Sequence, residues 1–383
     1  MSSTFRKTAM TVAMAVAGLT AASAAFAQAQ EIKLGYAGPL TGGQAQYGKD
    51  MQNGIVLAID DMNATKPKIG GKDVKFVLIS EDDQADPKTG SVVAQKLVDA
   101  GIQGMLGHFN SGTSIPASMV YNRAGIPQIA MATAPEYTRQ GFKTTFRMMT
   151  SDTQQGSVIG AFVVKKLGAK NIAIVDDRTA YGQGLADEFE KAAKAAGGKI
   201  VRREFTNDKA VDFKAVLTNI KRSNPDVIFY GGAETQSAPM AKQVKELGMK
   251  SPLVSGEMSK TDNFLKLAGP AAEGTVVSLA GLPLDQMPGG AAYEKKYEKR
   301  FGSKVQTYSP YAYDGATAMM TAMIKAGSAD PARYLPVLAA TNMQGVTTKT
   351  LAYDARGDLK DGGITVYKVQ GGKWTVLETV GGK

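Results

Sequence analysis

The chain has 383 residues, 43% of them hydrophobic and 21% charged, which is typical of a folded protein long enough for two cores. It contains no cysteine, which excludes disulfides, thiolate metal sites and a lipid-modified cysteine. The net charge is +10, but basic and acidic residues are mixed along expected helices, as in 294–300. Such mixing indicates solvated helix faces, so we expect no nucleic-acid partner.

The first residues predict an export signal. Residues 6 and 7 are basic, 9–19 form an apolar stretch, and 25–27 read Ala-Phe-Ala, a small-x-small cleavage pattern. The apolar stretch is too short and too rich in Ala and Gly to span a membrane well. We therefore expect residues 1–27 to be a cleaved signal peptide. The mature protein is expected to be a periplasmic monomer without a lipid anchor.

In the remaining chain, short β-branched runs alternate with helical patterns. Pairs of an expected strand and the helix that follows it lie at 32–36 and 55–62, 74–79 and 87–98, 172–175 and a helix ending at 197–198, and 227–230 and 240–247. Strict alternation of this kind predicts an α/β fold, with parallel sheets and crossover helices on both faces.

The segments directly after the expected strands are candidates for a binding site, because parallel sheets bind ligands beyond the carboxyl ends of their strands. These segments are rich in Gly, hydroxyl residues and Tyr, and they lie at 38–42, 107–112, 176–182, 231–234 and 256–257. A Ser or Thr at a helix start offers its hydroxyl together with free amides, which suits a carboxylate. A plain helix cap is the alternative interpretation for Ser111.

No pattern in the chain specifies an enzyme, a metal or a cofactor. His108 is the only histidine, and no nucleophile elbow accompanies it. The acidic group at 81–86 ends in Asp86-Pro87, which is typical of a helix cap followed by Pro at the first helical position. The glycines near residue 38 do not match the dinucleotide spacing, and no phosphate loop is present. We therefore expect a non-catalytic protein without a metal or cofactor.

Taken together, these segments resemble the periplasmic binding proteins of branched-chain amino-acid ABC transporters, the leucine/isoleucine/valine-binding type. The resemblance covers essentially the whole mature chain and is carried by 38–42 with 45–48, 82–83 with 86–87, 107–111, 132–138, 181–185, 230–232 and 357–360.

This resemblance implies a type I periplasmic binding protein with two α/β lobes and three crossover connections. Lobe one is expected at 31–150 plus 281–356, and lobe two at 151–280 plus 357–383. A small solute would bind between the lobes, and a membrane permease would be the partner.

The resemblance also implies roles for particular residues. In the family, hydroxyls and amides of lobe one hold the carboxylate of the ligand, which assigns Ser111, Thr133 and the backbone around Asn110 to it. The ammonium group would meet Glu257, the carbonyl of Met131 and the Thr133 hydroxyl. The apolar pocket would consist of Tyr47, Phe109, Tyr181 and, as a fourth member, Tyr308.

The chain departs from the family pattern near this expected pocket. Ala233 and Glu234 follow Gly-Gly, where relatives can place a Tyr, so an aromatic wall is lost and a carboxylate introduced. Met131 replaces a small residue, and Met258 follows Glu257 where Gly is common. The expected ligand is an aliphatic amino acid. The alternatives are an aromatic carboxylate, urea or a short amide on the same fold, or an exported enzyme.

Overall fold

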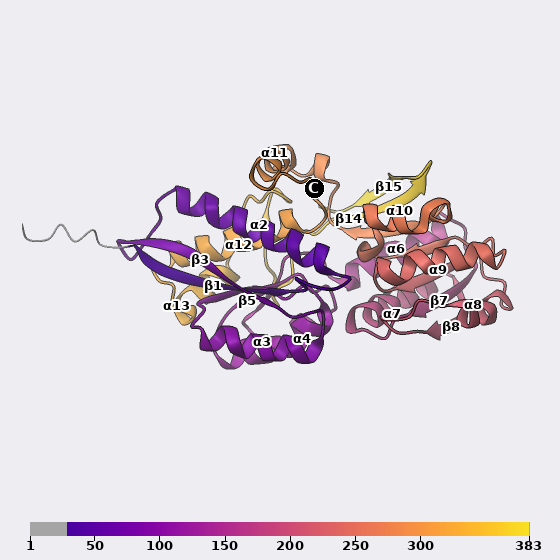
Figure 1. The fold of residues 1–383 in the computed structure, drawn as a ribbon, viewed down its shortest axis with the longest axis horizontal. Coiled ribbons are helices and arrows are strands. Elements are labelled where there is room, and N and C mark those ends of the chain that lie inside the picture. The colour runs from indigo at the N-terminus through magenta and orange to yellow at the C-terminus, as the bar shows by residue number, and fades with distance from the viewer. Residues whose placement is uncertain (1–28, 383) are drawn as a thin grey trace, which may run out of the picture.

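A computed structural model describes residues 29–382, so the expected signal peptide lies outside the described residues. Two lobes lie side by side, each built from one sheet with helices on both faces (Figure 1). This arrangement confirms the predicted α/β class. Within 29–382, no helix has the length and apolar character needed to cross a bilayer.

Lobe one contains a six-stranded sheet in the order β2-β3-β1-β4-β5-β6. Its strands run parallel except β2, which forms an antiparallel pair with β3. Helices α2 and α12 pack together over one face, and α3 and α4 pack together over the other (Figure 1). The strands are β1 (Gln30–Gly38), β2 (Lys68–Ile69), β3 (Lys72–Asp82), β4 (Gly104–Gly107), β5 (Gln128–Ala130) and β6 (Thr145–Arg147). The helices are α2 (Ala45–Ala64), α3 (Pro87–Asp99), α4 (Ser111–Arg123), α5 (Glu136–Arg139), α11 (Gly290–Phe301), α12 (Ser309–Lys325) and α13 (Pro331–Ala339).

Lobe two contains a seven-stranded sheet in the order β15-β14-β11-β10-β9-β7-β8. The strands from β11 to β8 are parallel, whereas β14 and β15 are antiparallel. Its strands are β7 (Asn171–Asp176), β8 (Lys199–Phe205), β9 (Val227–Gly231), β10 (Leu253–Ser255), β11 (Val276–Ala280), β14 (Ile364–Gln370) and β15 (Lys373–Val380). Its helices are α6 (Asp152–Lys165), α7 (Ala180–Ala195), α8 (Lys214–Lys221), α9 (Glu234–Glu246) and α10 (Asp262–Ala268), with the short helices η1 (Glu257–Ser259) and η2 (Gly269–Ala272).

The strand–helix alternation, predicted for most of the chain with its last pair at 227–247, does not continue after β11. After β11, the chain forms η3 (Leu284–Gln286) and three helices of lobe one in succession, followed by the small pair β12 (Asn342–Met343) and β13 (Leu351–Ala352). It then returns to lobe two as the antiparallel hairpin β14–β15. A hairpin needs only a tight turn and no crossover helix, so the rule for parallel strands does not apply there.

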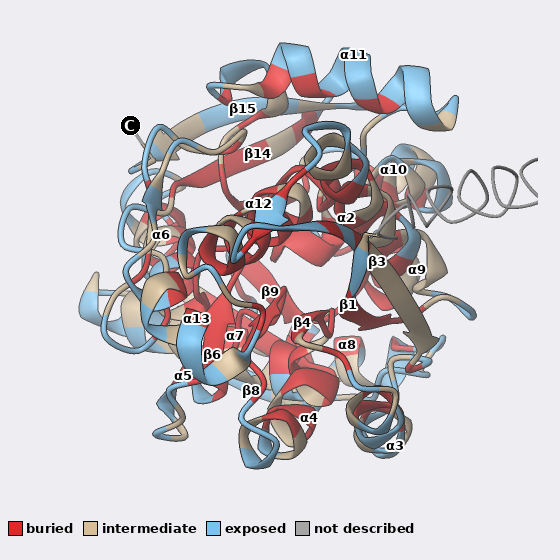
Figure 2. Cartoon of the chain, turned by 90° about the vertical axis from the view of Figure 1, so that its left-hand side faces the viewer, coloured by how far each residue is buried: buried red, intermediate tan, exposed pale blue. Residues whose placement is uncertain are grey.

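Local sequence explains where the helices near the cleft begin. The Asp86 carboxylate accepts a hydrogen bond from the Thr89 amide at 2.8 Å, and Pro87 is the first residue of α3, which confirms the predicted cap. Thr179 caps α7 in the same way, accepting from the Gly182 amide at 2.9 Å. The central strands are buried on both faces under these helices (Figure 2), as expected for parallel sheets.

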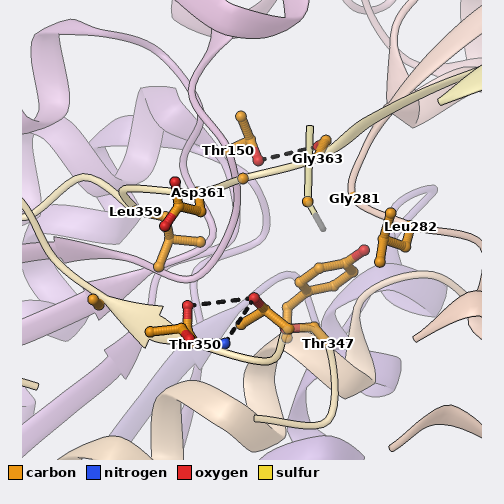
Figure 3. Close-up of a pocket in the computed structure, with 13 residues that line it drawn as sticks. Thr150, Gly281, Leu282, Thr347, Thr350, Leu359, Asp361 and Gly363 are labelled. Carbon is orange, nitrogen blue, oxygen red and sulfur yellow. Dashed lines mark hydrogen bonds between the residues drawn. The ribbon is translucent and has the colours of Figure 1, made fainter. Parts of the chain in front are cut away.

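The chain passes three times between the lobes, and the three connections lie against one another. The Thr150 hydroxyl donates to the Gly363 carbonyl at 3.3 Å, which joins the first connection to the third. The Thr365 hydroxyl donates to the Gly281 carbonyl at 2.7 Å, which joins the third to the second. Together they line one pocket (Figure 3). Three short connections held side by side are typical of a hinge.

Gly281 is a position where we expect any side chain to be costly. Its φ is +141°, and a Cβ built there would lie 1.6 Å from the Tyr311 hydroxyl oxygen. We expect Gly281→Ala to lower the free energy of unfolding by about 1–3 kcal/mol, measured by urea denaturation. Gly302→Ala is the matched control, because Gly302 has φ +65° and nothing within 4 Å of its Cβ position. Equal losses in the two variants would contradict a steric role for Tyr311.

Candidate functional site

A small cavity lies between the lobes, next to the carboxyl ends of β4, β5 and β10. Both lobes contribute to its wall. The lining residues are Phe109, Asn110, Ser111, Met131, Thr133, Met149, Tyr181, Glu257, Met258 and Tyr308.

The lobe-one side of the cavity offers uncharged hydrogen-bonding groups. Ser111 is the first residue of α4, where the backbone amides of the first turn have no partner within the helix. Its hydroxyl does not cap α4 but accepts a hydrogen bond from the Ala134 amide at 3.2 Å. Thr133, three residues beyond β5, is buried on the same wall. A helix N-terminus with nearby hydroxyls is suited to an anion.

The lobe-two side places a carboxylate in the cavity wall. Glu257 is the first residue of η1 and is only 3% exposed. Burial raises the pKa of its carboxyl, and a hydrogen bond donated by the Gln155 side-chain amide opposes this effect. None of the ion pairs within residues 29–382 includes Glu257. A buried carboxylate without a cation is costly, so this wall favours a positively charged ligand group.

Aromatic rings form the apolar part of the cavity. Phe109 meets Tyr308 edge to face at 4.8 Å between ring centroids, and Tyr47 stacks on Phe109 at 5.4 Å and meets Tyr308 edge to face at 5.6 Å. Tyr47 packs against these rings but is not among the residues that line the cavity, and its hydroxyl donates to the Met258 carbonyl of lobe two at 3.1 Å. Tyr181 contributes from the start of α7. This arrangement surrounds a ligand side chain with rings and few polar groups.

The structure does not bring Ala233 and Glu234 to the cavity. Ala233 is the N-cap residue of α9, and Glu234 begins that helix. The Glu234 carboxylate accepts hydrogen bonds from the side-chain amides of Gln46 in lobe one and Asn263, the latter at 3.0 Å. Glu234 is therefore part of a contact between the lobes.

Three residues near the cavity were not predicted from the sequence, and all three follow β6 in the chain. Met149 lines the cavity, Asp152 is the first residue of α6, and Gln155 donates to Glu257. Strand β6 has only three residues and was not recognised as a strand. The signal that could have identified these residues is their position directly after a strand, but this requires that β6 is recognised as one.

The surroundings of His108 indicate a structural role. Its Nδ1 lies 2.7 Å from an oxygen of Asp83, its Nε2 lies 3.1 Å from the Tyr121 hydroxyl, and all three side chains are buried. Asp82 accepts from the Leu40 amide at 2.9 Å. Throughout residues 29–382 there is no cluster of three or more His, Cys, Asp or Glu suited to a metal ion. The acidic group thus organises the loops that carry the cavity residues.

Two α/β lobes, three connecting segments and a cavity lined by both lobes define a two-lobed binding protein. A family model described as periplasmic binding protein matches residues 31–373, and the chain belongs to this family. The predicted family and type I fold are thereby confirmed.

Relatives and solved structures agree with this assignment over nearly the whole chain. The chain is 34% identical to Leu/Ile/Val-binding protein homolog 1 of Brucella melitensis, covering 89% of this chain and 91% of that protein. It is 32% identical to the leucine-, isoleucine-, valine-, threonine-, and alanine-binding protein of Pseudomonas aeruginosa, covering 93% and 94%. A leucine-binding protein from Thermotoga maritima shares its fold with a TM-score of 0.83 at 23% identity, covering 91% and 98%.

Proposed function

We propose that this protein is the periplasmic solute receptor of an ABC importer and that it captures an aliphatic amino acid between its lobes. One observation carries the proposal: neutral donors on the lobe-one wall and the buried carboxylate of Glu257 on the lobe-two wall line the same small cavity. The names of the Brucella and Pseudomonas relatives support an amino acid as the ligand.

The proposed binding mode follows from the charges of an amino acid. The ligand carboxylate would accept hydrogen bonds from Ser111, Thr133 and the first amides of α4, which stabilise an anion without a buried counter-charge. The ammonium group would pair with Glu257, which removes the cost of that buried charge. The side chain would contact Phe109 and Tyr181, with Met131 and Met149 adjusting to its shape.

Calorimetry on refolded, ligand-stripped protein tests the proposal. We expect leucine, isoleucine or valine to bind with a measurable heat, and bound amino acid to be recovered unchanged after incubation. Absence of heat with every zwitterion would refute the amino acid as ligand. Chemical turnover of the bound solute would instead support the enzyme alternative.

We further propose that lobe one, 31–150 plus 281–356, and lobe two, 151–280 plus 357–383, swing about the three connections to enclose the ligand. Contacts between the lobes support closure as one state of this motion: the Tyr47 hydroxyl donates to the Met258 carbonyl, and the Gln46 side-chain amide donates to Glu234. The closed form would then be delivered to the membrane permease.

We predict that closure of the lobes depends on pH, because the Glu234 carboxyl is buried at the contact between them. Burial raises the pKa of this carboxyl to about 7 in the closed form. Opening would expose Glu234 and return its pKa toward 4.5, so the protein takes up a proton on closing. The closed form therefore gains stability as the pH falls below about 8 and loses this stability as the pH rises through 7. This term should tighten ligand binding by up to about ten-fold between pH 8 and pH 6.

Glu234→Gln should abolish this contribution, because glutamine keeps an oxygen for Gln46 and Asn263 but does not titrate. The measurement is the ratio of dissociation constants at pH 8 and pH 6 for wild type divided by the same ratio for the variant. A quotient of one would contradict the prediction.

A further inference from the structure

Sulfur occurs in this protein only as the thioether of methionine, because the chain has 18 Met and no Cys. Three of these residues, Met131, Met149 and Met258, line the cavity between the lobes. Met131 follows β5 of lobe one, Met149 precedes the first connection between the lobes, and Met258 lies in η1 of lobe two. The cavity wall is therefore rich in a flexible apolar side chain whose sulfur is open to oxidation.

The three cavity methionines are closed off from solvent in this structure. None of them is more than 4% exposed. A contact between the lobes involves one of them directly, because the Tyr47 hydroxyl of lobe one donates to the Met258 carbonyl of lobe two at 3.1 Å. The proposed opening of the lobes would break this hydrogen bond and turn both cavity walls toward solvent. Access to the three sulfur atoms therefore depends on the same motion that admits the solute.

Methionines outside the cavity provide internal references for this motion. Met119 lies on α4 and is 42% exposed, so an oxidant reaches it whether the lobes are open or closed. Met319 in α12 is fully buried in the core and packs against Gly104 of β4, within lobe one, so movement of the lobes does not uncover it. The cavity methionines should react like Met119 in the open form and like Met319 in the closed form.

Oxidation of a cavity methionine would change the wall in two ways. Hydrogen peroxide transfers one oxygen atom to the thioether: the S–O bond forms as the O–O bond breaks, the sulfur loses two electrons, and both peroxide protons leave in water. The resulting sulfoxide is polar, whereas the thioether is apolar. Closure would then bury a strong dipole in a largely apolar wall, and the added oxygen would reduce the space for a solute.

We propose that Met131, Met149 and Met258 form an oxidation-sensitive wall. Peroxide converts them to sulfoxides in the open form and thereby weakens solute capture, and bound solute protects them. This inference rests on the proposed capture of an amino acid and adds a modification site to it. Bound solute holds the lobes closed, so the open fraction of the protein falls by the factor 1 + [solute]/Kd, and the oxidation rate should fall by the same factor.

The test is oxidation of the ligand-stripped protein by hydrogen peroxide, with and without leucine, followed by peptide mass spectrometry. At a leucine concentration of about 100 times Kd, we expect sulfoxide formation at Met131, Met149 and Met258 to slow about 100-fold. Met119 should oxidise at the same rate in both samples, and Met319 should stay reduced in both. Calorimetry on the oxidised, leucine-free sample should then show leucine binding weakened at least about ten-fold.

Methionine-to-leucine variants separate the cavity sulfur atoms from the others. The triple variant Met131→Leu, Met149→Leu and Met258→Leu has apolar side chains of similar volume and no cavity sulfur for peroxide to attack. Its affinity after peroxide treatment should stay within about two-fold of its own affinity before treatment. Met119→Leu is the matched control and should lose affinity on oxidation as the wild type does, because Met119 does not line the cavity.

The outcomes distinguish the oxidation-sensitive wall from the proposed function. Equal oxidation rates at the three cavity methionines with and without leucine would overturn the wall and leave the amino-acid receptor standing. Unchanged affinity after sulfoxides have formed there would also overturn it, as would equal losses of affinity in the triple variant and the wild type. Absence of binding of leucine, isoleucine and valine before oxidation would overturn both proposals. If the triple variant does not fold, the oxidation rates and the affinity of the oxidised wild type decide.

Discussion

Replacing Glu257 by Gln is expected to weaken amino-acid binding by roughly 30-fold to 1,000-fold, the largest effect of any single change in the cavity. Truncating one partner of a buried charge pair costs about 2–4 kcal/mol, because the other charge is left desolvated and unpaired. Glutamine has nearly the same volume and can still contact Gln155. Calorimetric titration with leucine at constant pH measures the change.

A matched control for this variant is Glu246→Gln in the same lobe. Glu246 lies at the end of α9 with its side chain 55% exposed and pairs with Lys214 at 3.4 Å. Exposed ion pairs contribute little, so we expect no change in affinity. Leucine binding by Glu257→Gln within three-fold of wild type would show that the ammonium group lies elsewhere.

Replacing Arg147 by Met is expected to lower the free energy of unfolding by about 3–5 kcal/mol, the largest stability effect that we predict. Arg147 is fully buried and donates to Asp358 at 2.5 Å, to Thr138 at 2.9 Å and to the Ala134 carbonyl at 2.8 Å. These bonds hold the end of β6 against the third connection between the lobes. Methionine fills most of the space but leaves the buried acceptors without donors.

Scanning calorimetry of the ligand-free protein checks this result, with an expected fall in Tm of roughly 5 °C or more. Arg139→Met is the control, because Arg139 is exposed and donates a single hydrogen bond to Thr153 at 3.1 Å. Equal shifts in Tm for the two variants would contradict a special role for the buried guanidinium. A fall in Tm with unchanged leucine affinity at low temperature would place Arg147 in the framework rather than in the site.

Much of the fold could be predicted because local sequence and local structure agree. The strand expected at 32–36 is the centre of β1, and the helix starting at Pro87 is α3. The C-terminal hairpin could not be predicted in the same way. Residues 364–380 are strand-forming in either orientation, and only the free edge of β11 decides that β14 pairs with it antiparallel.

The candidate site was predictable where it follows a recognisable strand. Phe109 and Ser111 lie after β4, and Glu257 lies after β10, so the strand-end rule identified their segments. Thr133 follows β5 and was assigned only by the resemblance to the family. Met149 and Asp152 follow β6, which is too short to recognise by its pattern. Glu234 follows β9 by the same rule, yet its side chain turns to Gln46 and away from the cavity.

By itself, the sequence determined the α/β class, the family and the segments from which the cavity is built, because strand periodicity, helix caps and strand-end residues act over a few neighbouring positions. Only the tertiary structure decided which side chains share the cavity. The distance between Asp152 and Glu257 along the chain says nothing about the charge that each places on the other. That interaction depends on burial and separation in space, which arise only when the chain is folded.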